Sequence, residues 1–363
     1  MGYRQTLSDS ASDHPADVPY SVLDLAPIRQ GGTAAEALRN TLDLARHAER
    51  WGYHRYWLAE HHSSRGLAGS TPEILIGQVA ARTSRMRVGA GGVMLSHYSA
   101  LKVAENFRML ETLYPGRIDL GIGRAPGSDP RTARALAHGP GALGVEHFPE
   151  QIADLIGYVH GELPQGHPFR GVRAMPEGPT MPEVWLLGSS GESAALAAHF
   201  GTAFSFAHFI SSEGGVEVTR AYLAEFRPSP MLASPRASAA VFALAADTEA
   251  EALRLARSRD LWILRLYTGR PGAFPSIEEA EAYPYTEQDL GIIRHARRRT
   301  IAGAPEQVRE RLSTLAAEYG VDELVIVTIA HEFEARLRSY QLLAEVFGLS
   351  PVSGLDGDRM ATP

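Results

Sequence analysis

A short apolar segment near the start of the chain ends in three ionisable residues, Glu60, His61 and His62. The segment, Arg55–Ala59, is typical of a buried strand, which has no structural need for three such groups at its exit. In chains that alternate strands and helices, ligands bind at the carboxyl ends of the strands. Adjacent side chains on a strand point to opposite sides, which disfavours a metal shared by both histidines. We expect one histidine in an active site, although one packed and one exposed histidine would give the same pattern.

A second segment, Arg117–Ile122, leads into a glycine followed by an arginine. Gly123 allows a ligand to come close to the backbone, and Arg124 supplies a permanently charged guanidinium that can donate two parallel hydrogen bonds. A phosphate or a carboxylate is the natural partner of such a group. A surface ion pair is the commoner fate of a single arginine.

A third segment, Glu183–Leu187, runs into a helix through small and hydroxyl residues: Gly188, Ser189, Ser190 and Ser193. A helix start of this kind exposes unpaired N–H groups and the positive end of the helix dipole, which together favour an anion. Serine is also an ordinary N-cap residue, so a plain cap fits equally well. With Arg124 one strand away, a shared phosphate becomes the better interpretation. The Gly-Lys-Ser/Thr ending of a Walker A loop is absent.

A glycine pair, Gly91 and Gly92, lies in the segment between the first two. It permits a bulge, an unusual peptide geometry, or close approach of a flat ring to the backbone. Val93 and Met94 would then offer that ring an apolar face. A glycine bend at a barrel corner is the alternative.

These residues need elements to position them, and short apolar runs alternate with helical patterns along the chain. Eight strands that are each followed by a helix predict a closed (β/α)8 TIM barrel of the α/β class. The predicted strands are Tyr20–Leu25, Arg55–Ala59, Met86–Gly91, Arg117–Ile122, Glu183–Leu187, Ala203–Phe206, Ala237–Ala245 and Glu323–Thr328. The predicted helices lie near Ala34–Trp51, Thr71–Thr83, Ala100–Leu113, Pro149–Val159, Glu192–Phe200, Glu213–Phe226, Thr248–Arg259, Pro305–Glu318 and Glu332–Phe347.

Two insertions, after strands 4 and 7, interrupt the repeat. Gly161–Pro182 is rich in glycine and proline, and Leu266–Gln288 contains three prolines and several aromatic residues. Long connections of this kind are usually lids or binding loops. We expect a flexible arm over residues 1–17, one barrel domain over 18–350, and a tail over 351–363.

Composition excludes several classes of protein. The 363 residues include no cysteine, so cysteine-ligated zinc, iron–sulfur clusters and thiol nucleophiles are excluded. The net charge of −7 gives no overall attraction to nucleic acid or to anionic lipid. No apolar run approaches the ~18 residues of a membrane span, and the polar start is not a secretory signal. We expect a cytoplasmic protein.

Four short motifs in this order resemble those of the flavin-dependent bacterial luciferase-like monooxygenases. The opening at 21–28 resembles the uncharacterised single-gene branch of oxidoreductases in that family, and the resemblance covers roughly Tyr20 to Phe347. The motifs are Trp-Leu-Ala-Glu-His-His at 57–62, Val-Gly-Ala-Gly-Gly-Val-Met-Leu at 88–95, Pro-Gly-Arg-Ile-Asp-Leu-Gly-Ile-Gly-Arg-Ala-Pro-Gly at 115–127, and Trp-Leu-Leu-Gly-Ser-Ser at 185–190.

The resemblance implies a barrel that binds FMN, supplied in reduced form by a separate reductase. His61 falls on the catalytic histidine of the family, which implies reaction at the flavin C4a position, and we expect Glu60 to assist it. Arg124 falls on the arginine that binds the flavin phosphate, and Gly188, Ser189, Ser190 and Ser193 on the phosphate-binding helix start. Gly91 and Gly92 fall where relatives hold a cis peptide beneath the flavin ring, which Ala26, Val93 and Met94 would line.

The substrate side is expected to include His62, His208 and Trp185, with His97 and Tyr98 as weaker candidates. We expect a monooxygenase that uses reduced FMN and O2 on a small apolar or carbonyl-bearing substrate, and no metal. Its partners would be a transient flavin reductase and a second copy of the chain, not nucleic acid or a membrane. The alternatives are a hydride-transfer enzyme using the deazaflavin F420, a flavin-binding subunit without catalysis, and a metal-dependent hydrolase using the two histidines.

Overall fold

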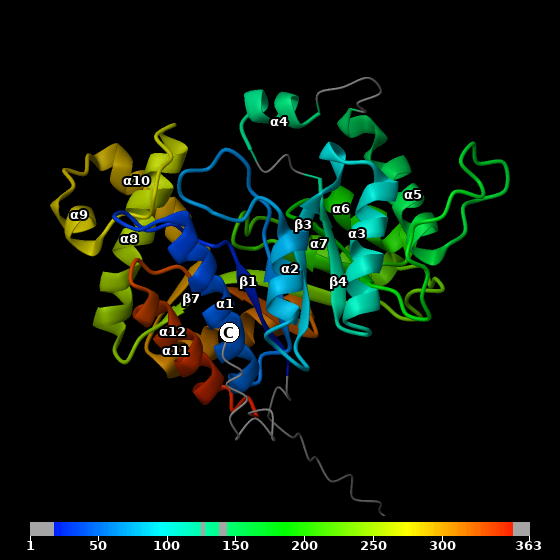
Figure 1. Cartoon of the computed structure of the whole chain (residues 1–363). Coiled ribbons are helices and arrows are strands. Elements are labelled where there is room, and N and C mark those ends of the chain that lie inside the picture. The colour runs from blue at the N-terminus through cyan, green and yellow to red at the C-terminus, as the bar shows by residue number, and fades with distance from the viewer. Residues whose placement is uncertain (1–17, 125–127, 138–143, 351–363) are drawn as a thin grey trace, which may run out of the picture.

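Eight parallel strands close into a ring in the computed structural model, which describes residues 18–124, 128–137 and 144–350 (Figure 1). Each strand pairs with the next, and the last pairs with both β7 and β1. The TIM-barrel prediction is therefore confirmed. The ring consists of β1 (Tyr20–Asp24), β2 (Arg55–Leu58), β3 (Arg87–Met94), β4 (Ile118–Gly123), β5 (Glu183–Gly188), β6 (Ala203–Phe206), β7 (Ala237–Ala245) and β9 (Glu323–Val327).

Helices surround the ring, and capping residues fix where they begin and end. In the first long helix, the Thr33 side chain accepts from the backbone N–H of Glu36 at 3.1 Å, and Gly52 ends the helix with a φ of +89°. The main helices are α1 (Ala34–Trp51), α2 (Pro72–Ala80), α3 (Ala100–Leu113), α5 (Phe148–His160), α6 (Gly191–Phe200), α7 (Gly215–Glu225), α8 (Glu249–Tyr267), α11 (Pro305–Tyr319) and α12 (Phe333–Val346).

Some elements were not predicted. A ninth strand, β8 (Thr300–Gly303), pairs with the outer part of β7 and lies outside the ring. Within the predicted insertion and just after it come α9 (Ile277–Ala282) and α10 (Glu287–Arg297), both packed on α8. The short helices η1 (Leu95–His97), α4 (Pro130–Leu136) and η2 (Val145–His147) were also missed. The Gly161–Pro182 excursion lacks helix and strand, as predicted.

The insertion after β7 is attached to the rim of the barrel. Phe274 exchanges backbone hydrogen bonds with the segment after β1: its N–H donates to Ile28 at 2.9 Å, and its carbonyl accepts from Gln30 at 2.7 Å. The Phe274 ring is buried and stacks on Trp262 of α8, with ring centroids 4.4 Å apart. This insertion therefore lies against the β1 side of the barrel mouth, where a lid would lie.

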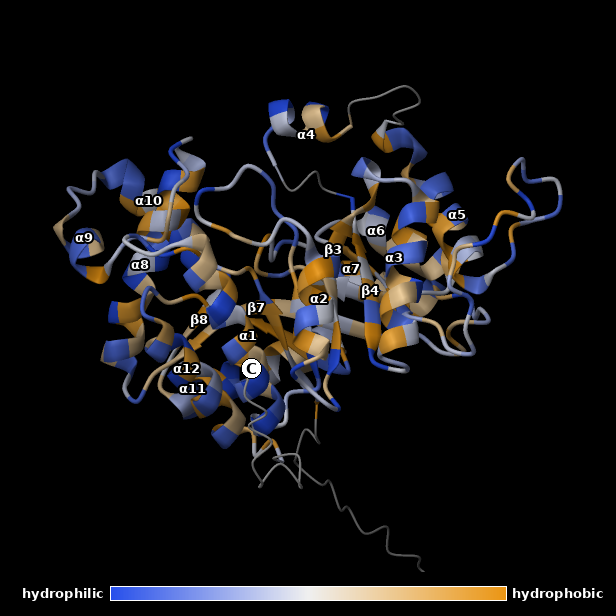
Figure 2. Cartoon of the chain, in the orientation of Figure 1, coloured by the Kyte–Doolittle hydropathy of each residue, from blue (hydrophilic) through white to orange (hydrophobic). Residues whose placement is uncertain are grey.

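Apolar residues dominate the strands, as the hydropathy colouring shows (Figure 2), but the strand starts carry a buried ionic layer. Arg55 donates to Asp119 at 2.8 Å and to Glu323 at 2.7 Å, and all three side chains are buried. Trp57 and Trp185 meet edge to face above it, with centroids 5.2 Å apart. The layer closes the amino end of the barrel, so a ligand has room only at the carboxyl end.

In the part of the chain that the structure describes, no helix is both long and apolar enough to cross a membrane. The predicted arm (1–17) and tail (351–363) lie outside the described residues, as do residues 125–127 of the arginine motif.

Candidate functional site

The four predicted constellations lie at the carboxyl ends of β2, β3, β4 and β5, which are consecutive neighbours in the ring. Residues that are more than 120 positions apart in the chain are thus brought to one sector of the rim. In α/β barrels this is the end at which active sites are built.

Glu60 is a fully engaged carboxylate at the exit of β2. It is 1% exposed, and it accepts hydrogen bonds from His62 Nε2 at 2.6 Å, Tyr98 Oη at 2.7 Å and the Met94 backbone N–H at 3.0 Å. Burial and, next, the hydrogen bond to the Glu60 carboxylate raise the pKa of Tyr98, so its hydroxyl remains a donor. Glu60 therefore joins the end of β2 to the end of β3.

Among the described residues, no hydrogen bond joins the His61 ring to this network. Its backbone N–H donates to the Gly69 carbonyl at 2.7 Å, while its ring Nδ1 is buried and has no partner among the described residues. Burial, followed by the charge of His62, lowers the pKa of His61 to about 4. The imidazole is neutral near pH 7 and keeps a nitrogen available for a ligand. The two histidines therefore differ in their partners: His62 is held by Glu60, and the His61 ring is not.

The peptide bond between Gly91 and Gly92 is cis, as the resemblance implies, and the pairing of β3 with β4 shifts register between Ala90 and Val93. A side chain on Gly91 would lie 2.7 Å from Leu23 and one on Gly92 would lie 2.7 Å from the Gly121 carbonyl. Both glycines are therefore required by strand packing itself. Of the other residues predicted to line the ring, Ala26 and Val93 are buried and Met94 is half-buried.

Arg124 and the start of α6 lie together. The Arg124 guanidinium, one-third exposed, forms an ion pair with Glu192 in the first turn of α6. Ser190 is the N-cap of α6 in an extended conformation and its side chain makes no capping hydrogen bond, whereas Ser193 is buried. A side chain on Gly188 would lie 2.4 Å from the Ser193 hydroxyl, so only glycine fits there. The sequence did not predict the pairing with Glu192, although this residue immediately follows the serine and glycine run.

The predicted substrate-lining residues are distributed differently. His62 is held by Glu60 at the rim. His208 is 9% exposed and its Nδ1 lies 2.9 Å from the hydroxyl of Tyr319 on α11, so its ring is directed toward the surrounding helices. Trp185 is fully buried near the start of β5 and donates to Glu183 at 2.7 Å, so it packs inside the barrel.

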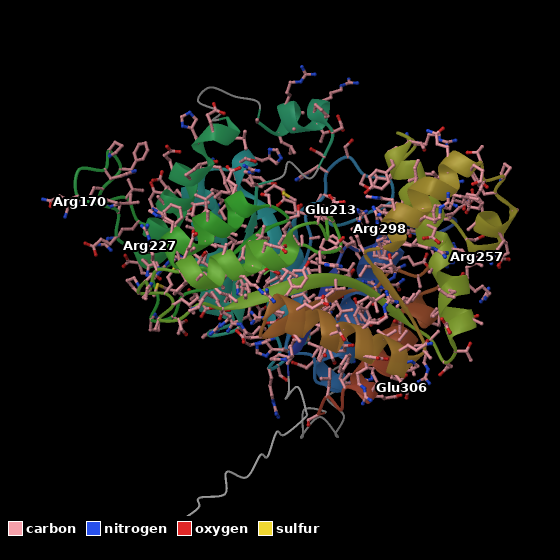
Figure 3. All side chains as sticks on the ribbon, turned by 180° about the vertical axis from the view of Figure 1, so that it is seen from behind. Arg170, Glu213, Arg227, Arg257, Arg298 and Glu306 are labelled. Atoms are coloured by element: carbon pink, nitrogen blue, oxygen red, sulfur yellow. The ribbon has the colours of Figure 1, made fainter. Side chains whose placement is uncertain are left out.

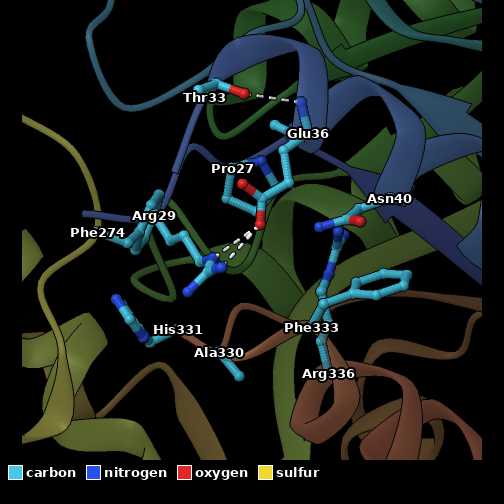
Figure 4. A pocket seen from close by; sticks show the side chains of 11 residues that line it. Pro27, Arg29, Thr33, Glu36, Asn40, Phe274, Ala330, His331, Phe333 and Arg336 are labelled. Carbon is cyan, nitrogen blue, oxygen red and sulfur yellow. Dashed lines mark hydrogen bonds and ion pairs between the residues drawn. The ribbon is translucent and has the colours of Figure 1, made fainter. Parts of the chain in front are cut away.

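A separate recess lies between the ends of β1 and β9 (Figure 4). Arg29 donates to Glu36 through Nε at 3.0 Å and Nη2 at 2.8 Å, and the Nε2 of His331 is buried without a partner in the described part. None of the predicted site residues lines this recess. Across residues 18–124, 128–137 and 144–350, no group of three or more histidine, aspartate or glutamate side chains is placed to hold a metal ion.

Comparison with known proteins identifies the family. A family model described as "Luciferase-like monooxygenase" matches residues 18–323 of the chain. The chain belongs to the luciferase-like monooxygenase family. Among curated luciferase-like relatives, the Bacillus subtilis (strain 168) protein YwcH is 49% identical over 331 residues, covering 91% of this chain and 99% of that protein. The N-acetyl-S-alkylcysteine monooxygenase of the same organism is 40% identical to this chain, and the match covers 90% of this chain and 97% of that protein.

Solved structures share the fold of this chain. The structure of apo-MsnO8 superposes with a TM-score of 0.84 at 39% identity, covering 92% of this chain and 100% of that one. More distant structures share the luciferase-like fold. The oxygenating constituent of 3,6-diketocamphane monooxygenase from Pseudomonas putida, in complex with FMN, has a TM-score of 0.65 at 18% identity, with coverage of 90% and 97%. An F420-dependent secondary alcohol dehydrogenase superposes with a TM-score of 0.63 at 12% sequence identity, covering 91% of this chain and 98% of that one.

Proposed function

We propose that this luciferase-like protein is an FMN-dependent monooxygenase that uses reduced flavin and O2 to oxygenate a small apolar or carbonyl-bearing organic substrate. The observation that carries the proposal is the meeting of Arg124 with the start of α6, two strands along the rim from the unpartnered ring nitrogen of His61. This arrangement separates an anchor for an anion from a group able to act on a reacting atom.

The residues present fit FMN. Its phosphate needs cationic and N–H donors, which Arg124, the free hydroxyl of Ser190 and the N-terminus of α6 supply. Its ring needs a flat apolar slot, for which the cis Gly91–Gly92 peptide and the buried apolar side chains of Ala26 and Val93 are available at this end of the barrel. When bound, the reduced flavin supplies the electrons that activate O2.

The protein's own groups then have distinct tasks. Arg124, which is paired with Glu192, would hold the phosphate of the cofactor. Glu60 holds the β3 segment at Met94 and keeps His62 and Tyr98 in place. His61, neutral at pH 7, accepts or holds a proton at the reacting edge. The insertion attached through Phe274 lies where it would exclude water from this reaction.

The relative named N-acetyl-S-alkylcysteine monooxygenase supports a thioether as one substrate class to test. The assay combines the protein with FMN, a separate flavin reductase, NADH and O2, and follows oxygenated products from N-acetyl-S-methylcysteine and a panel of aldehydes and ketones. Product that depends on both reduced FMN and O2 supports the proposal. Tight binding of F420 with no affinity for FMN would favour the hydride-transfer alternative. A protein that binds FMN but stays inert across the panel would favour a non-catalytic flavin subunit.

The proposal includes a cytoplasmic homodimer that meets its reductase only transiently. Ile74 on α2 and Met109 and Leu113 on α3 are 64%, 50% and 61% exposed, and α2 and α3 pack together. A second copy covering this apolar surface would explain these exposures. Sedimentation of Leu113→Glu against the parent tests the dimer, which the charged variant is expected to dissociate.

A further inference from the structure

A second concentration of basic side chains lies away from Arg124, where the loop after β6 faces the end of α10. The two walls enclose a cavity, and Figure 3 shows Glu213 and Arg298 close together on this face of the molecule. The cavity, called here the Arg298–Arg299 cavity, is lined by Ser211, Ser212, Glu213, His295, Arg298 and Arg299.

Among the residues that line this cavity, Arg299 has a buried donor that the described part of the chain leaves without a hydrogen-bond partner. It is 7% exposed, and its Nη2 donates to the Tyr267 hydroxyl at 2.8 Å, while its Nε is buried and has no hydrogen-bond partner among the described residues. An unsatisfied buried donor is costly, most of all on a charged group, and it points to a missing acceptor. That donor belongs to a residue that lines an open cavity.

The other basic side chains leave donors free as well. Arg298 donates to Nδ1 of His295, which therefore acts as the acceptor and leaves Nε2 as a donor. Ser211 and Ser212 add two half-exposed hydroxyl groups from the opposite wall. Against these stands one carboxylate, the exposed Glu213.

The charge near Arg299 is also unbalanced. Arg259, 4% exposed, donates to the Thr300 hydroxyl at 2.9 Å and lies over the Phe242 ring. Burial and the nearby charge of Arg299 lower the pKa of Arg259, and Asp260 opposes this effect. The Asp260 carboxylate is already bound by another arginine, Arg297, at 2.9 Å.

No ion pair within the described ranges includes Arg259, Arg298 or Arg299. Asp260 acts on Arg259 but is shared with Arg297, so the guanidinium groups here outnumber the carboxylates beside them, and a bound anion would relieve this imbalance.

We propose that the Arg298–Arg299 cavity binds an oxyanion: a phosphate, a sulfate or the carboxylate of a small organic ligand. A planar guanidinium with a free Nε–H matches two oxygens of such a group, and the hydroxyls of Ser211 and Ser212 reach it from the other side. The site lies at the exit of β6, whereas the proposed flavin phosphate anchor lies at the exits of β4 and β5. The proposal therefore does not depend on flavin binding.

The primary test is calorimetric titration of the flavin-free protein with inorganic phosphate and with sulfate at constant ionic strength. Arg298→Gln and Arg299→Gln should each weaken binding at least about tenfold, since each removes a charge-assisted contact. The matched control is Arg294→Gln, an exposed arginine one turn earlier on α10 that does not line the cavity and should bind like the parent. Because Arg299 is buried, its variant is checked for folding by circular dichroism, and Ser212→Ala provides a milder second variant with an expected loss of a fewfold.

Equal affinity in the parent, Arg298→Gln and Ser212→Ala, or no binding of either anion at millimolar concentration, would overturn the proposal. Two supporting outcomes distinguish the source of the oxyanion. If N-acetyl-S-methylcysteine displaces phosphate and its KM rises in Arg298→Gln while kcat holds, the cavity recognises the acidic end of a substrate. If phosphate binds and turnover is unaffected, the ligand is a free inorganic anion. A failure of the monooxygenase assay leaves the phosphate titration interpretable.

Discussion

Replacing Arg124 by alanine should weaken FMN binding strongly, for two reasons that the structure separates. The variant loses a charge-assisted contact with the phosphate, and it leaves the Glu192 carboxylate unneutralised in the first turn of α6, beside that phosphate. The contact contributes about 1.5–3 kcal/mol, and two like charges ~4 Å apart in a well-solvated setting add about 1 kcal/mol of repulsion. The sum, about 2.5–4 kcal/mol, corresponds to roughly 70- to 900-fold weaker binding.

The assay is equilibrium titration of FMN by fluorescence quenching, for the oxidised cofactor in air and for the reduced cofactor under anaerobic conditions. Riboflavin, which lacks the phosphate, serves as the internal comparison and should bind the parent and Arg124→Ala equally well. The double variant Arg124→Ala/Glu192→Gln removes the repulsion and should recover about fivefold in FMN affinity. Arg46→Ala is the matched control, since Arg46 lies 3.9 Å from Asp43 in an exposed ion pair on α1 and should leave affinity unchanged.

Two results would refute this reasoning. FMN affinity unchanged by Arg124→Ala would show that the phosphate lies elsewhere. An equal loss for FMN and riboflavin would show that the variant disturbs the ring slot or the fold, and that no phosphate contact is being measured.

Four further outcomes follow from the geometry. His61→Gln should keep FMN affinity within about threefold but lower turnover about 10²–10⁴-fold, as measured by single-turnover oxygen consumption. Burial lowers the pKa of His61 and His208 to about 4, so between about pH 6.5 and pH 4 these histidines are protonated in the unfolded state but not in the folded state. In urea titrations, the free energy of unfolding should therefore be constant above about pH 6.5 and should decrease from there to pH 4. The decrease should be smaller in the variant in which both histidines are replaced by glutamine. Arg55→Met removes the ion pair of the buried Glu323 and leaves the buried Asp119 with Arg87 as its cationic partner among the described residues. It should cost about 3–5 kcal/mol in urea denaturation, so a loss below about 1 kcal/mol would contradict the ionic layer. Gly121→Ala places a methyl group 2.1 Å from the Ala90 carbonyl oxygen of β3 and should lower the free energy of unfolding by at least about 3 kcal/mol. The control, Gly116→Ala, should lower it by about 1 kcal/mol, because Gly116 has a φ of +75° but open space around it.

Much of the barrel could be predicted because parallel strands covered on both faces are short apolar runs with clear ends. All eight ring strands lie within a residue or a few of the predicted ranges, and α1 has the predicted bounds. The strand β8 was missed because its four residues, Thr300–Gly303, follow an arginine run and carry little apolar signal of their own. It pairs with β7 only because the chain returns there through α10.

The site was predictable in its location more than in its contacts. Strand ends place Glu60, His61 and Arg124 at the rim in any barrel with this element order. The partners of these residues depend on distant segments: Tyr98 reaches Glu60, and Glu192 reaches Arg124. The direction of Trp185 also depends on strand tilt and register, which one strand's sequence does not determine.

The most direct test of the central claim is a crystal structure of the protein with FMN bound. The account predicts the phosphate in contact with Arg124 and the first residues of α6, and the ring beside the Gly91–Gly92 peptide within reach of His61. An FMN phosphate bound away from Arg124 and the start of α6, or an FMN ring outside the barrel mouth, would contradict it.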